Sequence, residues 1–210
     1  MGTVIMQNVV SVDGFIADEH DDVGPLHEWY FSGDTPITGT PPDEQFDHSG
    51  AGNGFRVSSA SAPYVRAMWE SIGVIVMGRT LFDLMNGWEG KPPAGEHVVV
   101  VSHRPKPAGW HPEASYHFAD GPKAAIAKAQ ELAGDRTIAV NAGEAGSRIF
   151  AAGLVDEVAM DVVPVVFGSG KRFFAGIEGQ QLLEDPHLVI QGDRVLHLKF
   201  KVRRSPAGGA

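Results

Sequence analysis

Three short segments combine residue types that bind anions, and each follows an apolar run typical of a buried strand. They are Gly78-Arg79-Thr80, Ser102-His103-Arg104 and Asn141-Ala142-Gly143-Glu144-Ala145. A glycine lets the backbone approach a ligand, the N–H groups at a helix start attract phosphate, and a guanidinium binds phosphate through two parallel hydrogen bonds. Any one segment alone is typical of a tight turn. Together, at the carboxyl ends of parallel strands, they predict an anion-binding rim at one edge of a sheet.

A carboxylate within an apolar strand is the second candidate for chemistry. Asp161 lies in the run Val158-Ala159-Met160-Asp161-Val162-Val163, where burying an unpaired charge is costly. One interpretation is a catalytic residue that anchors a substrate or relays a proton. The other is a structural carboxylate that faces solvent on an edge strand or forms a salt bridge. The sequence alone leaves both interpretations open.

A long segment rich in Gly, Pro, Asp and Thr, residues 18–58, interrupts an otherwise regular pattern. Loops of this length are uncommon in compact domains and often act as lids. Trp29, Tyr30 and Phe31 could stack on a flat substrate or close over another bound ligand. Alternatively, they pack on the outside of the domain or across a dimer interface. We expect a lid that governs substrate choice and contributes little to global stability.

The elements that must position these residues alternate between strands and helices. Short runs rich in Val and Ile predict strands at 4–10, 73–77, 98–101, 137–140, 158–167 and 188–202. Helical patterns lie at 61–72, 80–85, 122–132 and 144–152. The alternation predicts a largely parallel sheet flanked by helices, and the alternating Leu196, Leu198 and Phe200 predict antiparallel strands at the end. We expect one α/β domain over 1–204 and a disordered tail at 205–210.

Composition argues against several classes of protein. The chain has 210 residues, 43% hydrophobic and 20% charged, values typical of a globular protein. A formal charge of −9 argues against nucleic-acid binding. The absence of cysteine removes disulfides, cysteine zinc sites and iron–sulfur clusters, and the histidines show no metal-ligand spacing, so we expect no metal. No apolar run approaches the roughly 20 residues that span a bilayer, so we expect a cytoplasmic protein with no membrane partner.

Several motifs follow one another in a recognisable order along the chain. Ser11-Val12-Asp13-Gly14-Phe15-Ile16-Ala17 fits the signature Ser-x-Asp-Gly-x-Ile-Ala, Met77-Gly78-Arg79-Thr80 contains Met-Gly-Arg, and Gly153-Leu154-Val155-Asp156-Glu157 precedes Pro164, Gly168, Gly170 and Phe173. With Ser102-His103-Arg104 and Ala142-Gly143 between them, these motifs resemble the dihydrofolate reductase superfamily. They are most similar to the reductase domain of the bifunctional riboflavin-biosynthesis deaminase/reductase. The resemblance covers nearly the whole chain apart from 18–58, and it implies a three-layer α/β/α fold.

The resemblance implies hydride transfer from NADPH to a small-molecule substrate, and it implies a homodimer. Backbone groups near Val9, Ile16 and Ala17 would hold the nicotinamide carboxamide. Arg79, Arg104, Ser102 and His103 would hold the 2′-phosphate. Gly78 and Thr80 would also contact the cofactor. The pyrophosphate would lie against the third segment, Ala142, Gly143, Glu144 and Ala145.

Two departures from the family pattern limit what the resemblance implies. Dihydrofolate reductases hold the pterin with a carboxylate on the helix before the Met-Gly-Arg strand, and the matching positions here, Ser61 and Ala62, are not acidic. Ala142 replaces the first glycine of a pair that members join by a cis peptide bond. We therefore predict a reductase of a small unsaturated heterocycle or of a carbonyl or imine compound, and not of dihydrofolate. The alternatives are a 5-amino-6-ribosylaminouracil reductase, a non-catalytic nucleotide-binding protein on the same fold, and a deazaflavin in place of NADPH.

Overall fold

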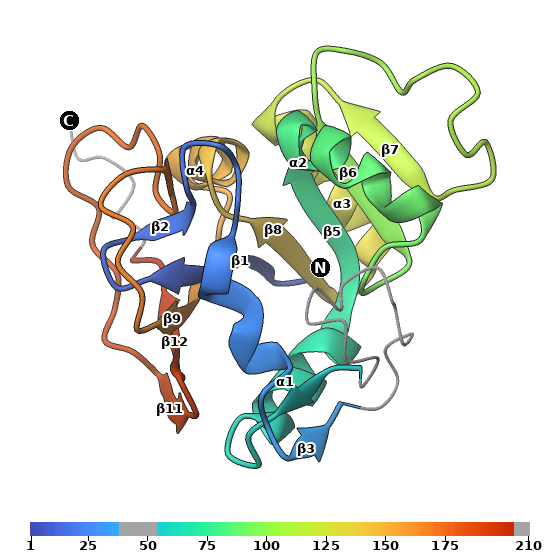
Figure 1. Ribbon diagram of the computed structural model, residues 1–210. Helices are drawn as coiled ribbons and strands as arrows, with labels where there is room; N and C mark the ends of the chain where they lie inside the picture. The colour runs from blue at the N-terminus through green and yellow to red at the C-terminus, as the bar shows by residue number, and fades with distance from the viewer. Residues whose placement is uncertain (38–53, 204–210) are drawn as a thin grey trace.

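A computed structural model describes residues 1–37 and 54–203 of the protein (Figure 1). The predicted tail at 205–210 and the middle of the 18–58 segment lie outside these residues. In the described ranges, no helix combines the length and the apolar character that crossing a membrane requires.

An eight-stranded sheet runs through the molecule in the order β11-β12-β9-β1-β8-β5-β6-β7. Each neighbouring pair from β9 to β7 is parallel, whereas β12 and β11 join the sheet antiparallel. The prediction of a mostly parallel sheet with antiparallel C-terminal strands is therefore confirmed. The strands are β1 Val4–Ser11, β5 Ile72–Gly78, β6 His97–Val101, β7 Tyr116–Ala119, β8 Thr137–Asn141, β9 Glu157–Val163, β11 Leu188–Gly192 and β12 Val195–Lys201.

Helices cover both faces of this sheet because its central strands are apolar on both faces. Val74 and Val76 of β5 pack into the cluster that buries one side of α3 (Pro122–Ala133) and α4 (Glu144–Ala151). Ile75 and Met77 point the other way and pack with Phe82 of α2 (Arg79–Leu84). Helix α1 (Ala62–Ser71) covers that second face nearer to β9 and β12. The result is three layers, as predicted (Figure 1).

The structure differs from the predicted elements mainly where strands end. The expected strand 158–167 stops at Val163, because Pro164 has no N–H to donate to the ladder. The expected strand 188–202 is a hairpin of β11 and β12 that turns at Arg194, where φ is 55°. The sequence pattern does not predict β7 or the two short pairs β2 (Phe15–Ala17) with β10 (Lys171–Arg172) and β3 (Thr35–Pro36) with β4 (Arg56–Val57).

The first part of the 18–58 segment belongs to the hydrophobic core. Residues Gly24–Tyr30 form a 3₁₀ helix, η1, in which Leu26 and Trp29 are only 0% and 2% exposed. Both side chains join the cluster that contains Val9 of β1 and Val65 of α1. The start of the segment therefore supplies large side chains to the core, and the role of the segment as a lid stays a prediction.

Candidate functional site

The three anion-binding segments lie at the same edge of the sheet. Strand β5 lies between β6 and β8, and all three are parallel, so their carboxyl ends are neighbours. A Cβ added to Gly78 would lie 3.1 Å from the Cβ of Ala145 in the first turn of α4. The first and third segments are therefore in close contact at a position that favours glycine.

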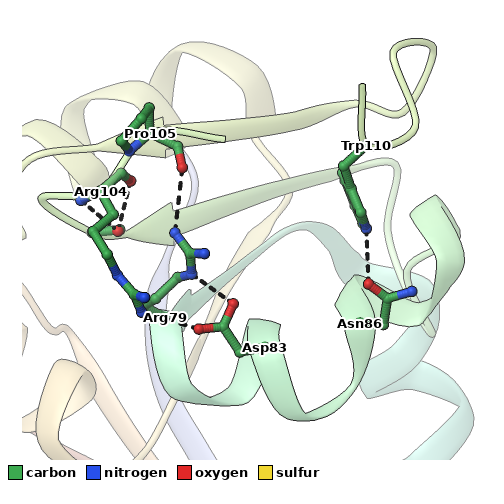
Figure 2. A network of polar contacts seen from close by, with 7 residues as sticks. Arg79, Asp83, Asn86, Arg104, Pro105 and Trp110 are labelled. Atoms are coloured by element: carbon green, nitrogen blue, oxygen red, sulfur yellow. Dashed lines mark hydrogen bonds and ion pairs between the residues drawn. The ribbon is translucent and has the colours of Figure 1, made fainter. Parts of the chain in front are cut away.

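A carboxylate joins the first segment to the second, as Figure 2 shows. Arg79 Nε lies 2.7 Å from Asp83 Oδ1, and Arg104 Nη2 lies 3.0 Å from Asp83 Oδ2. Arg79 Nη1 also donates to the Pro105 carbonyl at 3.3 Å, and its guanidinium lies 5.4 Å from the centroid of the Phe82 ring. One carboxylate thus holds two guanidinium groups together, an arrangement that an oxyanion such as phosphate also stabilises.

Ser102 and His103 make local contacts at the end of β6. Ser102 Oγ donates to the Arg104 carbonyl at 2.7 Å and accepts from the Arg104 N–H at 2.9 Å. His103 is exposed and pairs with Asp120. Ser102 therefore shapes the turn that presents Arg104. Thr80, from the first segment, is exposed in the first turn of α2.

The segment predicted to face the nicotinamide lies against the third anion-binding segment. A Cβ added to Gly143 would lie 3.2 Å from Cδ1 of Ile16. Val9 and Ala17 are buried, the Val9 N–H donates to Asn8 Oδ1, and Ala17 pairs with Lys171 of β10. The predicted nicotinamide and pyrophosphate positions are therefore adjacent.

The start of α4 offers fewer backbone donors than the sequence predicts. The Gly143 N–H donates to the Phe173 carbonyl at 3.0 Å. The N–H groups of Glu144 and Ala145 lie in the first turn, where a helix provides no partner of its own. The Ala142–Gly143 bond is trans, like every other described peptide bond. The anion-binding capacity of this helix start therefore rests on Glu144 and Ala145.

Asp13 fixes the turn that follows β1. Its carboxylate accepts hydrogen bonds from Ser11 Oγ at 2.6 Å and from the N–H groups of Phe167 and Gly168 at 3.2 and 2.7 Å. The bond from Ser11, supported by the two backbone donors and opposed by partial desolvation, lowers the pKa of Asp13 below its usual value. The ionised carboxylate therefore ties the turn to the loop after β9.

Asp161 lies in a buried polar triad with His197 and Ser61. Asp161 Oδ1 is 2.6 Å from His197 Nδ1, and His197 Nε2 is 2.9 Å from Ser61 Oγ. The three residues are 6%, 0% and 0% exposed. Burial, and then the Asp161 charge, raises the pKa of the neighbouring Tyr64 hydroxyl, which stays neutral. These surroundings fit the salt bridge of the structural interpretation, and a catalytic role of Asp161 stays a prediction.

The aromatic residues expected to contact a substrate stack on one another. The ring centroids of Trp29 and Tyr30 are 3.9 Å apart, and Tyr30 lies 5.7 Å from Trp69 of α1. Trp29 is buried and meets His197 edge-on at 5.2 Å. The expectation for Trp29 is therefore corrected: its ring is part of the core rather than at a surface that a substrate reaches. Contact of Tyr30 or Phe31 with a substrate stays a prediction.

A cavity of about 140 Å³ lies between α1 and the chain that follows α2, on the face opposite α3 and α4. Asn141, on its wall, directly precedes Ala142 and Gly143, so the cavity adjoins the predicted pyrophosphate position, which Ile16 of the predicted nicotinamide position also approaches. A shallower hollow of about 420 Å³ lies at the other edge of the sheet, where Asp156 precedes β9 and Glu157 begins it. The described residues that line the 140 Å³ cavity are Gln7, Trp69, Ile72, Ile75, Trp88, Pro93, Ala94, Ala139 and Asn141.

Sequence reasoning does not single out several of these residues. Asp83 follows Arg79 by four positions on one helix, a spacing that favours an ion pair and could have identified it. Trp88 lies between glycines in Asn86-Gly87-Trp88-Glu89-Gly90, a pattern that indicates an unusual turn. His197 carries no such signal, because only the register of β9 and β12 places it opposite Asp161.

Solved structures of low sequence identity share this fold. A putative riboflavin biosynthesis protein from Shewanella sp. PV-4 aligns with a TM-score of 0.68 at 18% identity, over 97% of this chain and 100% of that chain. A diaminohydroxyphosphoribosylaminopyrimidine deaminase/5-amino-6-(5-phosphoribosylamino)uracil reductase from Thermotoga maritima aligns at 0.57 and 14% identity, over 96% and 57%. RibD from Acinetobacter baumannii aligns at 0.54 and 15%, over 97% and 58%. This chain spans little more than half of those last two proteins, and the expected dihydrofolate reductase-like fold is confirmed.

Sequence comparison places the chain in a family. No curated protein sequence matches it significantly. The sequence profile of the RibD C-terminal domain matches residues 2–201, nearly the whole described chain. The strand order, the rim of the sheet and this match agree, and the chain belongs to the RibD C-terminal domain family.

Proposed function

We propose that the protein is an NADPH-dependent reductase that transfers hydride to a small, flat unsaturated heterocycle or to a carbonyl or imine compound. Family membership implies an oxidoreductase. The observation that carries the choice of cofactor is the pair of guanidinium groups, Arg79 and Arg104, that Asp83 holds together beside α4.

The residues of the rim fit NADPH. Two adjacent arginines suit the ribose 2′-phosphate that distinguishes NADPH from NADH. Gly78, which precedes Arg79, lies close to Ala145, so the start of α4 is next to the two arginines. The first N–H groups of α4 suit a pyrophosphate. When bound, NADPH supplies the hydride, and the chain's task is to hold both reactants in position.

The cavity beside the rim is the proposed position of the group that is reduced. Gln7 and Asn141 can orient a polar substrate there, while Trp69 and Trp88 exclude water. No described residue that lines this cavity titrates near neutral pH. Water is therefore the proposed proton donor, rather than Asp161, whose carboxylate is paired with His197.

A reductase of riboflavin biosynthesis is the second candidate, favoured by the family match. The Thermotoga maritima relative is described as a 5-amino-6-(5-phosphoribosylamino)uracil reductase. In that case the substrate of this chain would be a 5-amino-6-ribosylaminouracil compound. The homodimer implied by the resemblance remains a prediction.

Cofactor titration of the wild type and of two arginine variants tests the proposal. Arg104→Ala removes a phosphate contact and should weaken NADPH binding by about 10- to 150-fold, with little effect on NADH. Arg136→Ala is the matched control, because Arg136 is also ion-paired, to Glu96, but precedes β8 at the opposite edge of the sheet. Equal wild-type affinity for NADPH and NADH, or a preference for a deazaflavin, would overturn the cofactor assignment.

Turnover with the preferred cofactor then separates the two candidate functions. Reduction of a 5-amino-6-ribosylaminouracil compound supports a role in riboflavin biosynthesis. Reduction of other flat heterocycles supports the broader reductase proposal. Efficient reduction of dihydrofolate would contradict the inference drawn from Ser61 and Ala62. A chain that binds NADPH but reduces no compound of these classes would favour the non-catalytic alternative.

A further inference from the structure

The turn that follows α2 contains an asparagine–glycine pair in an unusual backbone conformation. The φ angles of residues 86–90 are 44°, 53°, 48°, 50° and 80°, so all of these residues lie in the left-handed region. Glycine tolerates this region, whereas other residues stay in it only where their surroundings enforce it. This left-handed turn begins with Asn86, which is exposed, and Gly87, which is buried. Water therefore reaches the side chain of Asn86, while Gly87 is held inside the fold.

An asparagine that precedes a glycine can lose ammonia without an enzyme. The backbone nitrogen of Gly87 attacks Cγ of Asn86, the Cγ–Nδ2 bond breaks, and Nδ2 leaves as ammonia with the proton of the attacking nitrogen. The product is a five-membered succinimide ring, which water opens to aspartate or to isoaspartate. The net reaction exchanges ammonia for water and involves no oxidation. Glycine favours the attack because it has no Cβ to hinder it.

The folded chain holds the reacting amide by both of its ends. Trp110 Nε1 donates to Asn86 Oδ1 at 3.0 Å (Figure 2), and Asn86 Nδ2 donates to Glu89 Oε1 at 2.7 Å. His111 Nε2 lies 3.1 Å from Glu89 Oε2 and helps to keep that carboxylate in place. Attack on Cγ requires the side chain to fold back onto its own backbone, and an amide bound at both ends is not free to do so. The two hydrogen bonds of the amide therefore oppose the reaction.

Packing around Gly87 adds a second restraint. A Cβ added to Gly87 would lie 2.5 Å from the Trp110 ring and 2.7 Å from the Phe82 ring. The indole that binds the Asn86 oxygen thus also lies against the residue that supplies the attacking nitrogen. Trp110, which comes from the segment between β6 and β7, therefore restrains both reacting groups.

Loss of ammonia would remove the contact that closes the turn. Either product carries a carboxylate at position 86 and has no side-chain N–H to donate to Glu89. The hydrogen bond from Asn86, and then that from His111, lowers the pKa of Glu89 below its usual value against a partial desolvation. Glu89 is therefore ionised at neutral pH, and two carboxylates would face each other where a donor and an acceptor now lie 2.7 Å apart.

We propose that Asn86–Gly87 is a site of spontaneous deamidation, and that Trp110 and Glu89 set its rate by holding the Asn86 amide. The reaction proceeds when the turn opens locally, and its product keeps the turn open. Modified chains therefore accumulate with the time that this segment has spent open. Because Trp88 of the same turn lines the 140 Å³ cavity, the reaction also loosens one wall of that cavity. This inference does not depend on the proposed reductase function.

Incubation of the full chain in ¹⁸O-enriched water measures the reaction, because opening of the succinimide adds one labelled oxygen. Peptide mapping by mass spectrometry gives the rate at Asn86 and separates it from the rate at Asn141, which precedes an alanine. The same chain unfolded in urea provides the unrestrained rate. We expect deamidation at Asn86 to be faster than at Asn141 in urea, and to be slowed at least about tenfold by folding.

Two tryptophan variants test the restraint. Trp110→Phe keeps a ring over Gly87 but removes the hydrogen bond to Asn86, so deamidation in the folded chain should accelerate about 2- to 10-fold, the range of one hydrogen bond. Trp29→Phe is the matched control, because it makes the same substitution in the core at η1, outside the left-handed turn. The rate at Asn86 should be unchanged in that variant.

A charge swap tests the partner of the amide. Asn86→Asp supplies the product directly, and hydrogen exchange at residues 86–90 should accelerate about 10-fold or more, as expected for the loss of a hydrogen bond to a charged group. Adding Glu89→Gln to this variant restores a donor opposite an acceptor with the two roles exchanged. Exchange in the double variant should return toward the wild-type rate. Glu89→Gln alone keeps an acceptor for Asn86 and is the control.

Each result either supports the inference or contradicts it. A rate at Asn86 no higher than at Asn141 in urea would exclude the site. Equal rates at Asn86 in the folded and the unfolded chain, or an unchanged rate in Trp110→Phe, would show that the fold does not restrain the amide. Wild-type exchange in Asn86→Asp, or no recovery in the double variant, would contradict the role of Glu89. None of these measurements uses a cofactor or a substrate, so their failure leaves the reductase proposal intact.

Discussion

At the scale of single residues, we expect Asp83 to set how strongly the proposed phosphate site at the rim attracts an anion. Its two carboxylate oxygens lie within 3.0 Å of Arg79 and Arg104, which orders both guanidinium groups. The same carboxylate competes with any phosphate that approaches them. A bound phosphate must therefore share the two cations with Asp83 or displace it.

Replacing Asp83 with Asn should reveal this competition. The variant keeps the shape of the side chain and removes one negative charge, worth about 1 kcal/mol at such a distance in water, so NADPH should bind about fivefold more tightly. NADH should change less, and the gain in NADPH affinity should shrink as salt is raised. Fluorescence titration at two salt concentrations measures both effects. Weaker NADPH binding would show instead that Asp83 is needed to hold the arginines in place.

The Ser61–His197–Asp161 triad is a structural tie between α1 and the edge of the sheet. Asp161→Ala leaves a buried imidazole without its partner and should lower the free energy of unfolding by about 3–5 kcal/mol. Ser61→Ala removes the hydroxyl that bonds His197 Nε2 and that accepts from Ser58 Oγ, and it should cost about 1–2 kcal/mol. Urea unfolding followed by circular dichroism gives both values. If Asp161→Ala unfolds like the wild type but loses turnover, the catalytic interpretation of Asp161 is restored.

At the scale of elements, η1 and the left-handed turn of residues 86–90, in which every φ is positive, lie on the same face of the sheet. They affect the stability of the fold in opposite ways. The turn carries strain of roughly 1–2 kcal/mol for each non-glycine residue, which the contacts of Trp110 and His111 must offset. In contrast, η1 buries Leu26 and Trp29 and stabilises the fold. The turn therefore depends on the contacts of Trp110 and His111, whereas η1 stabilises the fold by burial.

The contribution of η1 can be measured directly. Replacing Gly24 to Asn53 with a short linker removes Leu26 and Trp29 from the core, and the loss of two such side chains, about 5 kcal/mol or more, approaches the stability of a typical domain. We expect the shortened chain to be unfolded in a thermal scan. Leu26→Ala alone should cost about 2–5 kcal/mol, and Phe31→Ala, which is less buried, should cost less. A shortened chain that melts like the wild type would favour the lid interpretation.

The elements that the sequence predicts well are those with local signals. Helix α3 begins at Pro122 and ends just before Gly134, as those residues indicate, and the rim segments follow their strands as expected. The role of Trp29 and the partner of Asp161 are set by packing between distant segments, which no local pattern encodes. The cavity could not be predicted for the same reason, because its wall is assembled from β1, α1, β5, β8 and the left-handed turn.

At the scale of the whole molecule, one sheet connects every part of the candidate site. Strand β8 lies between β1 and β5, so the end of β8 contributes both to the anion-binding rim and to the cavity. Helix α4, on one face of the sheet, begins at the rim. The indoles of Trp69 and Trp88 line the cavity on the other face. The proposed cofactor site and the cavity therefore share a rigid support, which would favour the constant geometry that the proposed hydride transfer requires.

The central place of β1 also has a consequence for synthesis. Val4 pairs with Ile138 and Ile5 with Glu157, so β1 is made long before either of the strands that flank it in the sheet. At roughly 5–20 residues per second, a ribosome needs on the order of 10 s to produce them. During that interval β1 is an apolar strand with both edges open, which invites aggregation and chaperone binding. The rim and the cavity can assemble only after β8 and β9 have emerged and enclosed β1.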